Sequence, residues 1–251
     1  MKLSSIGKKI VVFSDVHNEI IKTKKIIEKE GADYNICLGD WFDSFYLDNT
    51  YHYRVTAEYL VNEFLPKENN ITLFGNHDLH YFFKSQYTMC SGYERRKHEA
   101  ISEIINYSFV DKFKWYIWID NYLCTHAGLH RNWIDPKCNN NEDIDIFLQK
   151  ESKRADEAMI GQKEHWFYEA GRSRGGRNRQ GGIVWLDFND EFECVDNLNQ
   201  IVGHTSQRNG TCTVLTNSEN SDNMCIDCFQ NQYLVIQNEK INIKNYIDLW
   251  Q

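Results

Sequence analysis

Short apolar runs alternate with amphipathic segments in the first third of the chain. Residues 9–13 (KIVVF) form a continuous apolar run of β-prone residues, and residues 18–30 then carry isoleucines at helical spacing. The pattern recurs downstream, where it predicts a strand over 33–38, a helix over 51–65 and a strand over 71–74. Strands that alternate with helices predict a parallel or mixed sheet covered by helices.

The second half of the chain combines one long helical pattern with further strands. Residues 116–124 predict a β-hairpin, and residues 142–169 predict a long helix. Strand-like runs follow at 183–188 and 200–205, and residues 212–243 predict three more strands in a terminal antiparallel sheet. Because no internal repeat or proline-rich linker interrupts this order, we predict one domain over residues 1–251.

The composition is that of a globular protein rather than a disordered or fibrous one. Hydrophobic residues make up 41% and charged residues 25% of the 251 residues. The longest apolar runs are far too short to cross a bilayer, and the N-terminus lacks the apolar stretch of a signal peptide. We therefore predict a cytoplasmic protein with no membrane association.

Charge and cysteine usage narrow the picture further. The formal net charge of −8 argues against stable binding of duplex nucleic acid, although nucleic acid stays open as a substrate. Eight cysteines sit largely in apolar strings, which predicts free thiols in a reducing compartment and no structural disulfides. The pair Cys225-x-x-Cys228 has no second pair at zinc-finger spacing, and residues three apart in a strand face opposite sides, so a structural role is favoured over a zinc site.

Polar residues stand at five predicted strand ends, where open α/β sheets bind their ligands. Asp15 and His17 are two apart in extended chain and so point to the same side, while the Asp40 carboxylate has two oxygens with which to bridge two cations. Carboxylate, imidazole and amide oxygen together are ligands for Mn, Fe, Ni, Co or Zn rather than for Ca or Mg. The five strand ends carry Asp15-x-His17, Asp40-x-x-Asp43, Asn76-His77-Asp78, His126 and His204.

In their order along the chain, five motifs resemble the pattern of the calcineurin-like metallophosphoesterases. They read SDVH at 14–17, GDWFD at 39–43, GNHD at 75–78, THAG at 125–128 and VGHT at 202–205, and GNHD is the most specific. The forms HAG and VGHT, with Asp43 three residues after Asp40, are most similar to the branch of bacterial and phage serine/threonine protein phosphatases and symmetrical diadenosine tetraphosphatases.

This resemblance implies an α/β fold, a four-layer αββα sandwich of two mixed β-sheets flanked by helices. It also implies two divalent metal ions, with Mn first among the candidates and Fe, Ni, Co or Zn as alternatives. A water shared by the two ions would become the hydroxide nucleophile. By the resemblance, Asp15, His17 and Asp40 would hold the first ion, and Asp40, Asn76, His126 and His204 the second.

The implied activity is hydrolysis of a phosphate ester, with His77 as general acid and Asp43 holding it in place. A phosphomonoesterase acting on a phosphorylated substrate, whether a nucleotide or a phosphoprotein, is the first hypothesis. Cleavage of diadenosine polyphosphates, cyclic nucleotides or other phosphodiesters is the enzymatic alternative. A non-catalytic metal-binding scaffold is the alternative of another class, and the complete set of ligand positions argues against it.

Two arginines usual in the protein-phosphatase branch are replaced here by Ser44 and Phe74, neither of which can imitate a bidentate guanidinium fork. Four arginines in the glycine-rich loop 171–182 are candidates to bind the phosphate instead, and a merely solvated loop is the alternative. These candidates are Arg172, Arg174, Arg177 and Arg179.

Other residues near the motifs are interpreted as structural. Trp41 and Phe42 are expected in the core, with a wall of the substrate site as the alternative. The remaining histidines are expected on surfaces or helix faces and receive no role: 52, 80, 98, 130 and 165.

Overall fold

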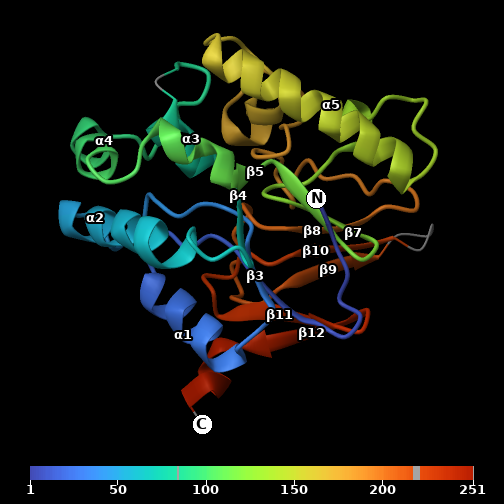
Figure 1. The fold of residues 1–251 in the computed structure, drawn as a ribbon. Helices are drawn as coiled ribbons and strands as arrows, with labels where there is room; N and C mark the ends of the chain where they lie inside the picture. The colour runs from blue at the N-terminus through green and yellow to red at the C-terminus, as the bar shows by residue number, and fades with distance from the viewer. Residues whose placement is uncertain (84, 217–220, 251) are drawn as a thin grey trace.

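Two mixed β-sheets pack face to face between helices in the computed structural model, which describes residues 1–83, 85–216 and 221–250 (Figure 1). Apolar side chains from both sheets meet in one cluster, with Ile36 and Leu38 from one sheet against Ile117 and Ile201 from the other. Alternate residues of the same strands point outward, so that Val11 and Phe13 pack under helices. The predicted αββα arrangement is confirmed.

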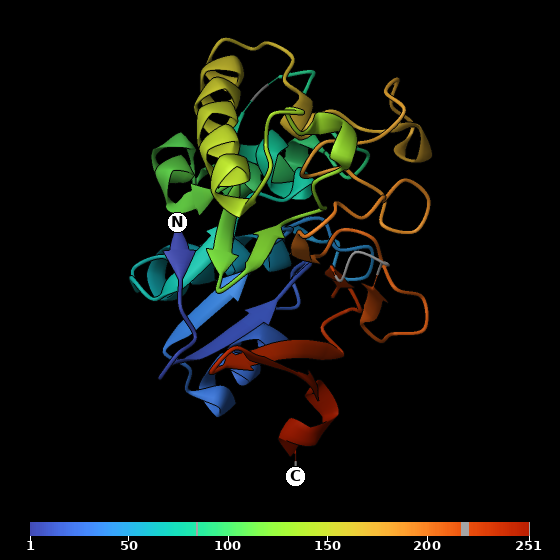
Figure 2. The ribbon, with the colours of Figure 1, turned by 90° about the vertical axis from the view of Figure 1, so that its right-hand side faces the viewer.

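The first sheet has the strand order β12-β11-β2-β3-β4-β5. Its parallel centre comes from the predicted strand–helix repeats, and the C-terminal hairpin of β11 and β12 adds to β2 antiparallel, as both views show (Figures 1 and 2). The bounds are β2 Lys9–Phe13, β3 Tyr34–Cys37, β4 Asn70–Leu73, β5 Phe113–Lys114, β11 Gln232–Gln237 and β12 Lys240–Asn245.

The second sheet has the order β1-β6-β7-β8-β10-β9. The predicted hairpin is present as the antiparallel pair β6 and β7, and β8 joins β7 in parallel. The bounds are β1 Lys2–Leu3, β6 Tyr116–Ile119, β7 Tyr122–Thr125, β8 Asn199–Val202, β9 Thr213–Thr216 and β10 Asp222–Cys225.

The described residues contain five α-helices, of which α1 packs on β2, whereas α4 packs on α2 and α3 (Figure 1). Short 3-10 segments lie at Tyr107–Lys112, Arg131–Trp133, Trp166–Tyr168, Arg172–Arg174 and Tyr246–Trp250, and a π segment lies at Leu60–Phe64. The α-helices are α1 Ile20–Glu30, α2 Thr50–Tyr59, α3 Asn76–Phe82, α4 Arg95–Ser102 and α5 Asn141–Ile160.

Three predicted elements differ from the structure. The helix predicted over 142–169 ends as α5 at Ile160, because the chain leaves the helix at Gly161. The apolar run 183–188 is a buried loop rather than a strand, and its Ile183 carbonyl accepts from the Ala127 N–H. The terminal antiparallel sheet was wrong, since β9 and β10 extend one sheet while β11 and β12 extend the other. Local apolar patterning marks strands but does not assign their partners.

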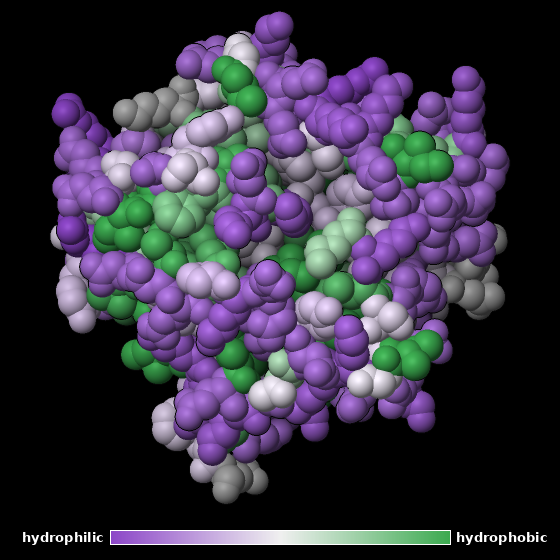
Figure 3. Space-filling model, in the orientation of Figure 1, coloured by the Kyte–Doolittle hydropathy of each residue, from purple (hydrophilic) through white to green (hydrophobic). Residues whose placement is uncertain are grey.

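Hydrophilic residues cover most of the face drawn in Figure 3, with apolar residues scattered among them. Among the described residues, no helix combines the length and the apolar character that a membrane span requires.

Candidate active site

The polar residues after β2, β3 and β4 meet at one edge of the first sheet, because these three strands are parallel and in register. Backbone φ is positive at several of them, with values of 53° at Asp15, 42° at His17, 59° at Asp40 and 63° at Asp43. His204, after β8 of the other sheet, has φ 66°. Residues other than glycine adopt this region rarely, and such strain clusters at functional sites.

Glycines beside these residues allow the carboxylates to pack against the backbone. A Cβ on Gly75 would collide with the Asp40 carboxylate, and one on Gly203 would collide with the Asp15 carboxylate. The GNHD and VGHT motifs therefore need glycine at these positions, because a larger residue would not leave room for the Asp40 and Asp15 carboxylates.

Two groups of donor atoms share Asp40. One consists of Asp15, His17 and Asp40, whose ligand atoms all lie within 4.8 Å of one another. The other consists of Asp40, His126 and His204 on the same criterion. The Asn76 Oδ1 atom lies 3.0 Å from His126 Nε2, which adds the predicted amide to the second group. The structure thus brings together all six predicted ligand side chains.

The donors in these groups are oriented as metal ligands would be. His17 Nδ1 lies 2.7 Å from the Phe42 carbonyl and His126 Nδ1 lies 2.8 Å from the Leu38 carbonyl, contacts that favour the tautomer with a free Nε2. Across the described residues, the His204 Nε2 atom is buried without any hydrogen-bond partner. Buried polar atoms left unpaired are costly, so the donor set fits cations that would satisfy it.

The carboxylates and imidazoles at this edge of the sheet are close together and buried. Burial raises the pKa of Asp15 to about 6, with the neighbouring Asp40 carboxylate contributing in the same direction. Burial, together with the positive charge of His126, holds the pKa of His204 well below its usual range. A neutral imidazole beside closely packed carboxylates is a ligand set for a cation.

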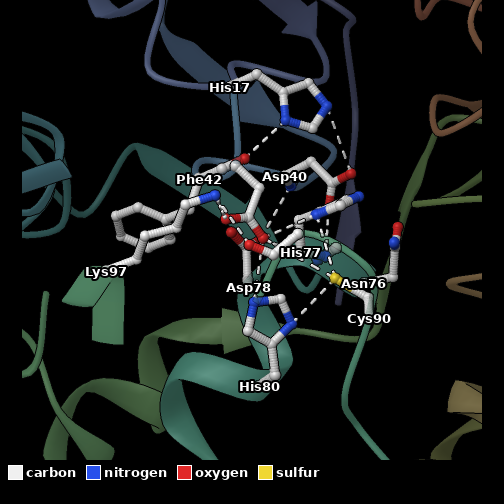
Figure 4. A network of polar contacts seen from close by, with 12 residues as sticks. His17, Asp40, Phe42, Asn76, His77, Asp78, His80, Cys90 and Lys97 are labelled. Carbon is white, nitrogen blue, oxygen red and sulfur yellow. Dashed lines mark hydrogen bonds and ion pairs between the residues drawn. The ribbon is translucent and has the colours of Figure 1, made fainter. Parts of the chain in front are cut away.

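Asp43 and His77 form a hydrogen-bonded pair next to the donor groups (Figure 4). Asp43 Oδ2 lies 2.9 Å from His77 Nδ1, and the His77 backbone N–H donates to Asp40 Oδ1 at 2.8 Å. The pair is therefore tied directly to the residue that both donor groups share. The contact expected between these two residues is present.

Three residues that the sequence did not single out hold Asp43 from other sides. His80 was expected on a surface or a helix face; it lies on α3 but is fully buried, and its Nε2 lies 3.1 Å from Asp43 Oδ2. Tyr81 donates its hydroxyl to Asp43 Oδ1, and Lys97 Nζ lies 3.5 Å from the same oxygen. The sequence did contain a signal for His80 and Tyr81. They follow His77 by three and four residues, and residues at these spacings share a helix face.

The segment just before α4 lies against Asp43 at Cys90 and Gly92. A Cβ on Gly92 would come within 2.5 Å of Asp43 Oδ2, and Lys97 Nζ donates to the Gly92 carbonyl at 2.9 Å. The same segment places Cys90 Sγ 3.3 Å from both His77 Nδ1 and His80 Nδ1. Burial would raise the pKa of the Cys90 thiol, but its contacts with the two histidines lower that pKa to about 7.

Asp78, the last residue of the GNHD motif, organises the backbone of the site. Its carboxylate accepts the N–H groups of Asp40 at 2.9 Å, Trp41 at 2.8 Å and Gly75 at 3.0 Å. These bonds join the tips after β3 and β4. Asp78 thus positions other residues and does not belong to either donor group.

The four loop arginines separate into two kinds. Arg174 and Arg177 line the same cavity as the donor groups, whereas Arg172 and Arg179 are exposed and are not part of its lining. Arg174 is held by two side chains, since its Nε lies 2.8 Å from Asp187 Oδ2 and its Nη2 lies 3.3 Å from Thr205 Oγ1.

The two positions that lack the usual arginine have different surroundings. Phe74 is buried in an aromatic cluster, with ring centroids 5.3 Å from Phe113 and 4.7 Å from Trp115. Ser44 lines the cavity, and its hydroxyl accepts from the backbone N–H groups of Tyr46 and Leu47. Neither residue replaces the phosphate-binding guanidinium.

The structural interpretation of several neighbours is confirmed. Trp41 and Phe42 are fully buried in the core. Cys225 donates to the Gly203 carbonyl while Cys228 contacts Cys212, so the two thiols face different partners, and all eight cysteines are free. His130 is buried just before the segment Arg131–Trp133, contrary to its expected position on a surface or helix face.

The cavity at this edge has a volume of about 1480 Å³. Its floor is formed by donor residues and by His77, and its rim carries the exposed rings of Phe45, Tyr46 and Phe229. A cavity of this volume can hold a drug-sized or larger ligand.

Comparison with known proteins agrees with this architecture. The family model of the calcineurin-like phosphoesterases matches residues 8–205, and the chain belongs to that family. It is therefore a phosphoester-hydrolysing enzyme, and the scaffold alternative is not supported. No curated protein matches the sequence.

Two solved structures resemble this chain across nearly its whole length. A cold-active protein-tyrosine phosphatase of a psychrophilic Shewanella species is 15% identical with a TM-score of 0.59, over 98% of this chain and 80% of that one. A protein serine/threonine phosphatase from Saccharomyces cerevisiae is 13% identical with a TM-score of 0.51, over 97% of this chain and 82% of that one. At such identities the likeness concerns the fold.

Proposed function

We propose that this enzyme hydrolyses phosphomonoesters at the cavity where the two donor groups meet. The observation that carries the proposal is that Asp40 belongs to both groups and also accepts the backbone N–H of His77. Cation binding and proton donation are thereby coupled through one side chain. The fold shared with two protein phosphatases is consistent with this activity.

Two divalent cations are the cofactors that the donor set fits. Mn²⁺ is our first choice because the donors mix carboxylate oxygen with imidazole nitrogen, and Fe, Co, Ni or Zn are the alternatives. Such cations, when bound, would neutralise charge on the phosphoryl oxygens and promote the ionisation of water. The residues that would hold them are Asp15, His17, Asp40, Asn76, His126 and His204.

His77 is the proton donor in this proposal. Its Nδ1 is engaged by Asp43, so Nε2 is the atom left to deliver a proton to the leaving oxygen. The Asp43 carboxylate stabilises the charged imidazolium and keeps its ring in one orientation, with His80 and Tyr81 holding the carboxylate in turn. The burial of Asp43 strengthens these electrostatic contacts.

Arg174 is the proposed contact for the substrate phosphate. It lines the cavity, and Asp187 and Thr205 hold its guanidinium from one side. Arg177 lines the same cavity and is exposed, so it would add charge without the same restraint. A guanidinium binds two phosphate oxygens at once, which the serine and phenylalanine at the usual positions do not do.

The rim supports a substrate with an aromatic or apolar portion. Phe45 and Tyr46 have exposed fractions of 81% and 86%, and Phe229 has 48%, although large apolar side chains tend to be buried. A nucleotide or a phosphorylated protein segment would present a ring or apolar side chain to these residues. The rim favours both kinds of substrate equally.

The test compares a monoester with its diester on the same leaving group. We expect the enzyme loaded with Mn²⁺ to hydrolyse p-nitrophenyl phosphate at least about tenfold faster, in kcat/KM, than bis(p-nitrophenyl) phosphate. Asp40→Asn prepared in parallel controls for contaminating phosphatases. Equal or reversed rates would overturn the monoesterase assignment in favour of a phosphodiesterase.

A further inference from the structure

A second set of metal-binding atoms lies beside the dinuclear groups and shares no residue with them. It consists of Asp43, His77 and Cys90, whose ligand atoms lie within 4.8 Å of one another. His77 and Cys90 are partly exposed and Asp43 is buried, so the set opens onto the cavity. Figure 4 shows the Cys90 sulfur facing the ring of His77. We propose that these three residues form an inhibitory zinc site.

The spacing of the donor atoms matches the demand of tetrahedral zinc. Zn–N and Zn–O bonds of about 2.0–2.1 Å and Zn–S bonds of about 2.3 Å place neighbouring ligand atoms about 3.3–3.6 Å apart. The observed separations are 2.9 Å from His77 Nδ1 to Asp43 Oδ2, 3.3 Å from Cys90 Sγ to His77 Nδ1 and 3.9 Å from Cys90 Sγ to Asp43 Oδ2. Shifts of a few tenths of an ångström would complete the geometry.

His80 supports this set from behind. It is fully buried, with Nδ1 3.3 Å from Cys90 Sγ and Nε2 3.1 Å from Asp43 Oδ2. Such outer contacts orient ligands and raise metal affinity. Gly92 keeps the loop against Asp43, which holds Cys90 in place. Lys97 contacts the other carboxylate oxygen, Oδ1, and so leaves Oδ2 to the metal.

The thiol decides which metal binds. Cys90 supplies a soft sulfur ligand, whereas the dinuclear groups offer only oxygen and nitrogen from their aspartates, asparagine and histidines. Thiolate favours Zn²⁺ over Mn²⁺, so the set that contains Cys90 would take zinc rather than Mn²⁺. With three protein ligands, a fourth position stays open toward the cavity.

Occupation of this site would stop proton transfer, a consequence that rests on the proposed function. Zinc on His77 Nδ1 would take the position of the proton that Asp43 accepts, and the ring would then be unable to become an imidazolium. Asp43 would also be withdrawn from orienting the ring, because its Oδ2 would bind the metal. Because the two donor groups share no residue with this site, its occupation would remove the general acid without taking a ligand from either group.

The binding test uses Co²⁺ as a spectroscopic probe on the full chain preloaded with Mn²⁺. A thiolate ligand gives a sulfur-to-cobalt charge-transfer band in the near ultraviolet. We expect the band in the wild type and in Cys138→Ser, a control at a partly buried thiol lining a separate cavity, and we expect its loss in Cys90→Ser. No band in the wild type, or a band that survives in Cys90→Ser, would overturn the proposal.

A second measurement needs no variant and so does not depend on the folding of one. Zn²⁺ should slow the alkylation of Cys90 by iodoacetamide at least about tenfold, read by mass spectrometry, and leave the rate at Cys138 unchanged. Equal slowing at both thiols, or none at Cys90, would contradict a zinc site.

Inhibition is measured separately on p-nitrophenyl phosphate. The Zn²⁺ concentration that halves the activity should rise about tenfold in Cys90→Ser relative to that variant's own uninhibited rate, and stay unchanged in Cys138→Ser. An unchanged value in Cys90→Ser would place inhibition at the dinuclear groups instead. If the band and the protection appear but no phosphatase activity is found, the proposed function fails while the zinc site stands.

Discussion

Asp43 Oδ2 lies 2.9 Å from His77 Nδ1, and this contact joins two motifs that are 34 residues apart in the chain. The strand–helix connection between them brings both residues to one sheet edge. Asp43 is fixed by several neighbours and faces His77 Nδ1, so its negative charge stabilises the protonated His77 ring.

Replacing His77 should separate proton donation from metal binding. We expect His77→Asn to lower kcat by about 10²–10⁴, the range for a lost general acid, while the bound Mn²⁺ stays the same. Steady-state kinetics and metal analysis of the same preparation measure the two effects. Unchanged turnover in His77→Asn would remove the assigned role.

Asp40→Asn should instead reduce the bound metal as well as the activity. Asp40 belongs to both donor groups, so the loss of its charge weakens both cations. We expect less than about half of the wild-type Mn²⁺ content after dialysis, against full content in Asp190→Asn, a change at an exposed carboxylate. Equal metal content in the two variants would show that Asp40 does not bridge the groups.

The loop arginines should differ in their effect on KM. Arg174→Ala should raise KM for p-nitrophenyl phosphate about tenfold, because a hydrogen bond to a charged group contributes about 1.5–3 kcal/mol. Arg172→Ala is the matched control, since this arginine is exposed and outside the cavity lining. Similar KM values in both variants would exclude Arg174 as the phosphate contact.

Introducing at position 74 the arginine that is usual in the protein-phosphatase branch should destabilise the fold. Phe74 has an exposed fraction of 2% and contacts two aromatic rings, so Phe74→Arg would bury a charge and lose their packing. We expect a loss of at least about 3 kcal/mol in the free energy of unfolding, measured with urea. Phe45→Arg, at a side chain exposed by 81%, should change it by no more than about 0.5 kcal/mol. A stable Phe74→Arg would contradict the packing described here.

Asp145 should contribute stability that depends on pH. Burial by itself would raise the pKa of Asp145, but hydrogen bonds from Tyr116, Lys2 and Trp118 outweigh it and lower the pKa. A lowered pKa means stability that is present above the unfolded value of about 3.9 and is lost as the pH falls through the folded value. The difference in unfolding free energy between wild type and Asp145→Asn should therefore be about 1–3 kcal/mol at pH 7 and shrink below about pH 4. A difference independent of pH would show that the carboxylate charge is not involved.

Much of the fold was predictable because its signals are local. A buried parallel strand is a continuous apolar run, and an amphipathic helix has its own period, so β2, α1, β3 and β4 are visible in the sequence. Strand pairing is not local. The C-terminal strands have the same patterning whichever sheet they join, and this is why the terminal antiparallel sheet was wrong.

In the active site, too, some features follow from local sequence and others from tertiary packing. The sequence by itself determined the donor residues, because their types and order along the chain carry the chemistry. Only the tertiary structure decided what surrounds Asp43, since His80, Lys97 and Cys90 reach it from two helices and a loop whose positions depend on packing. It also decided that Arg174 and Arg177 line the cavity while Arg172 and Arg179 do not. A loop's side chains are directed by the backbone that holds them, and that backbone is set by contacts with distant parts of the chain such as Asp187 and Thr205.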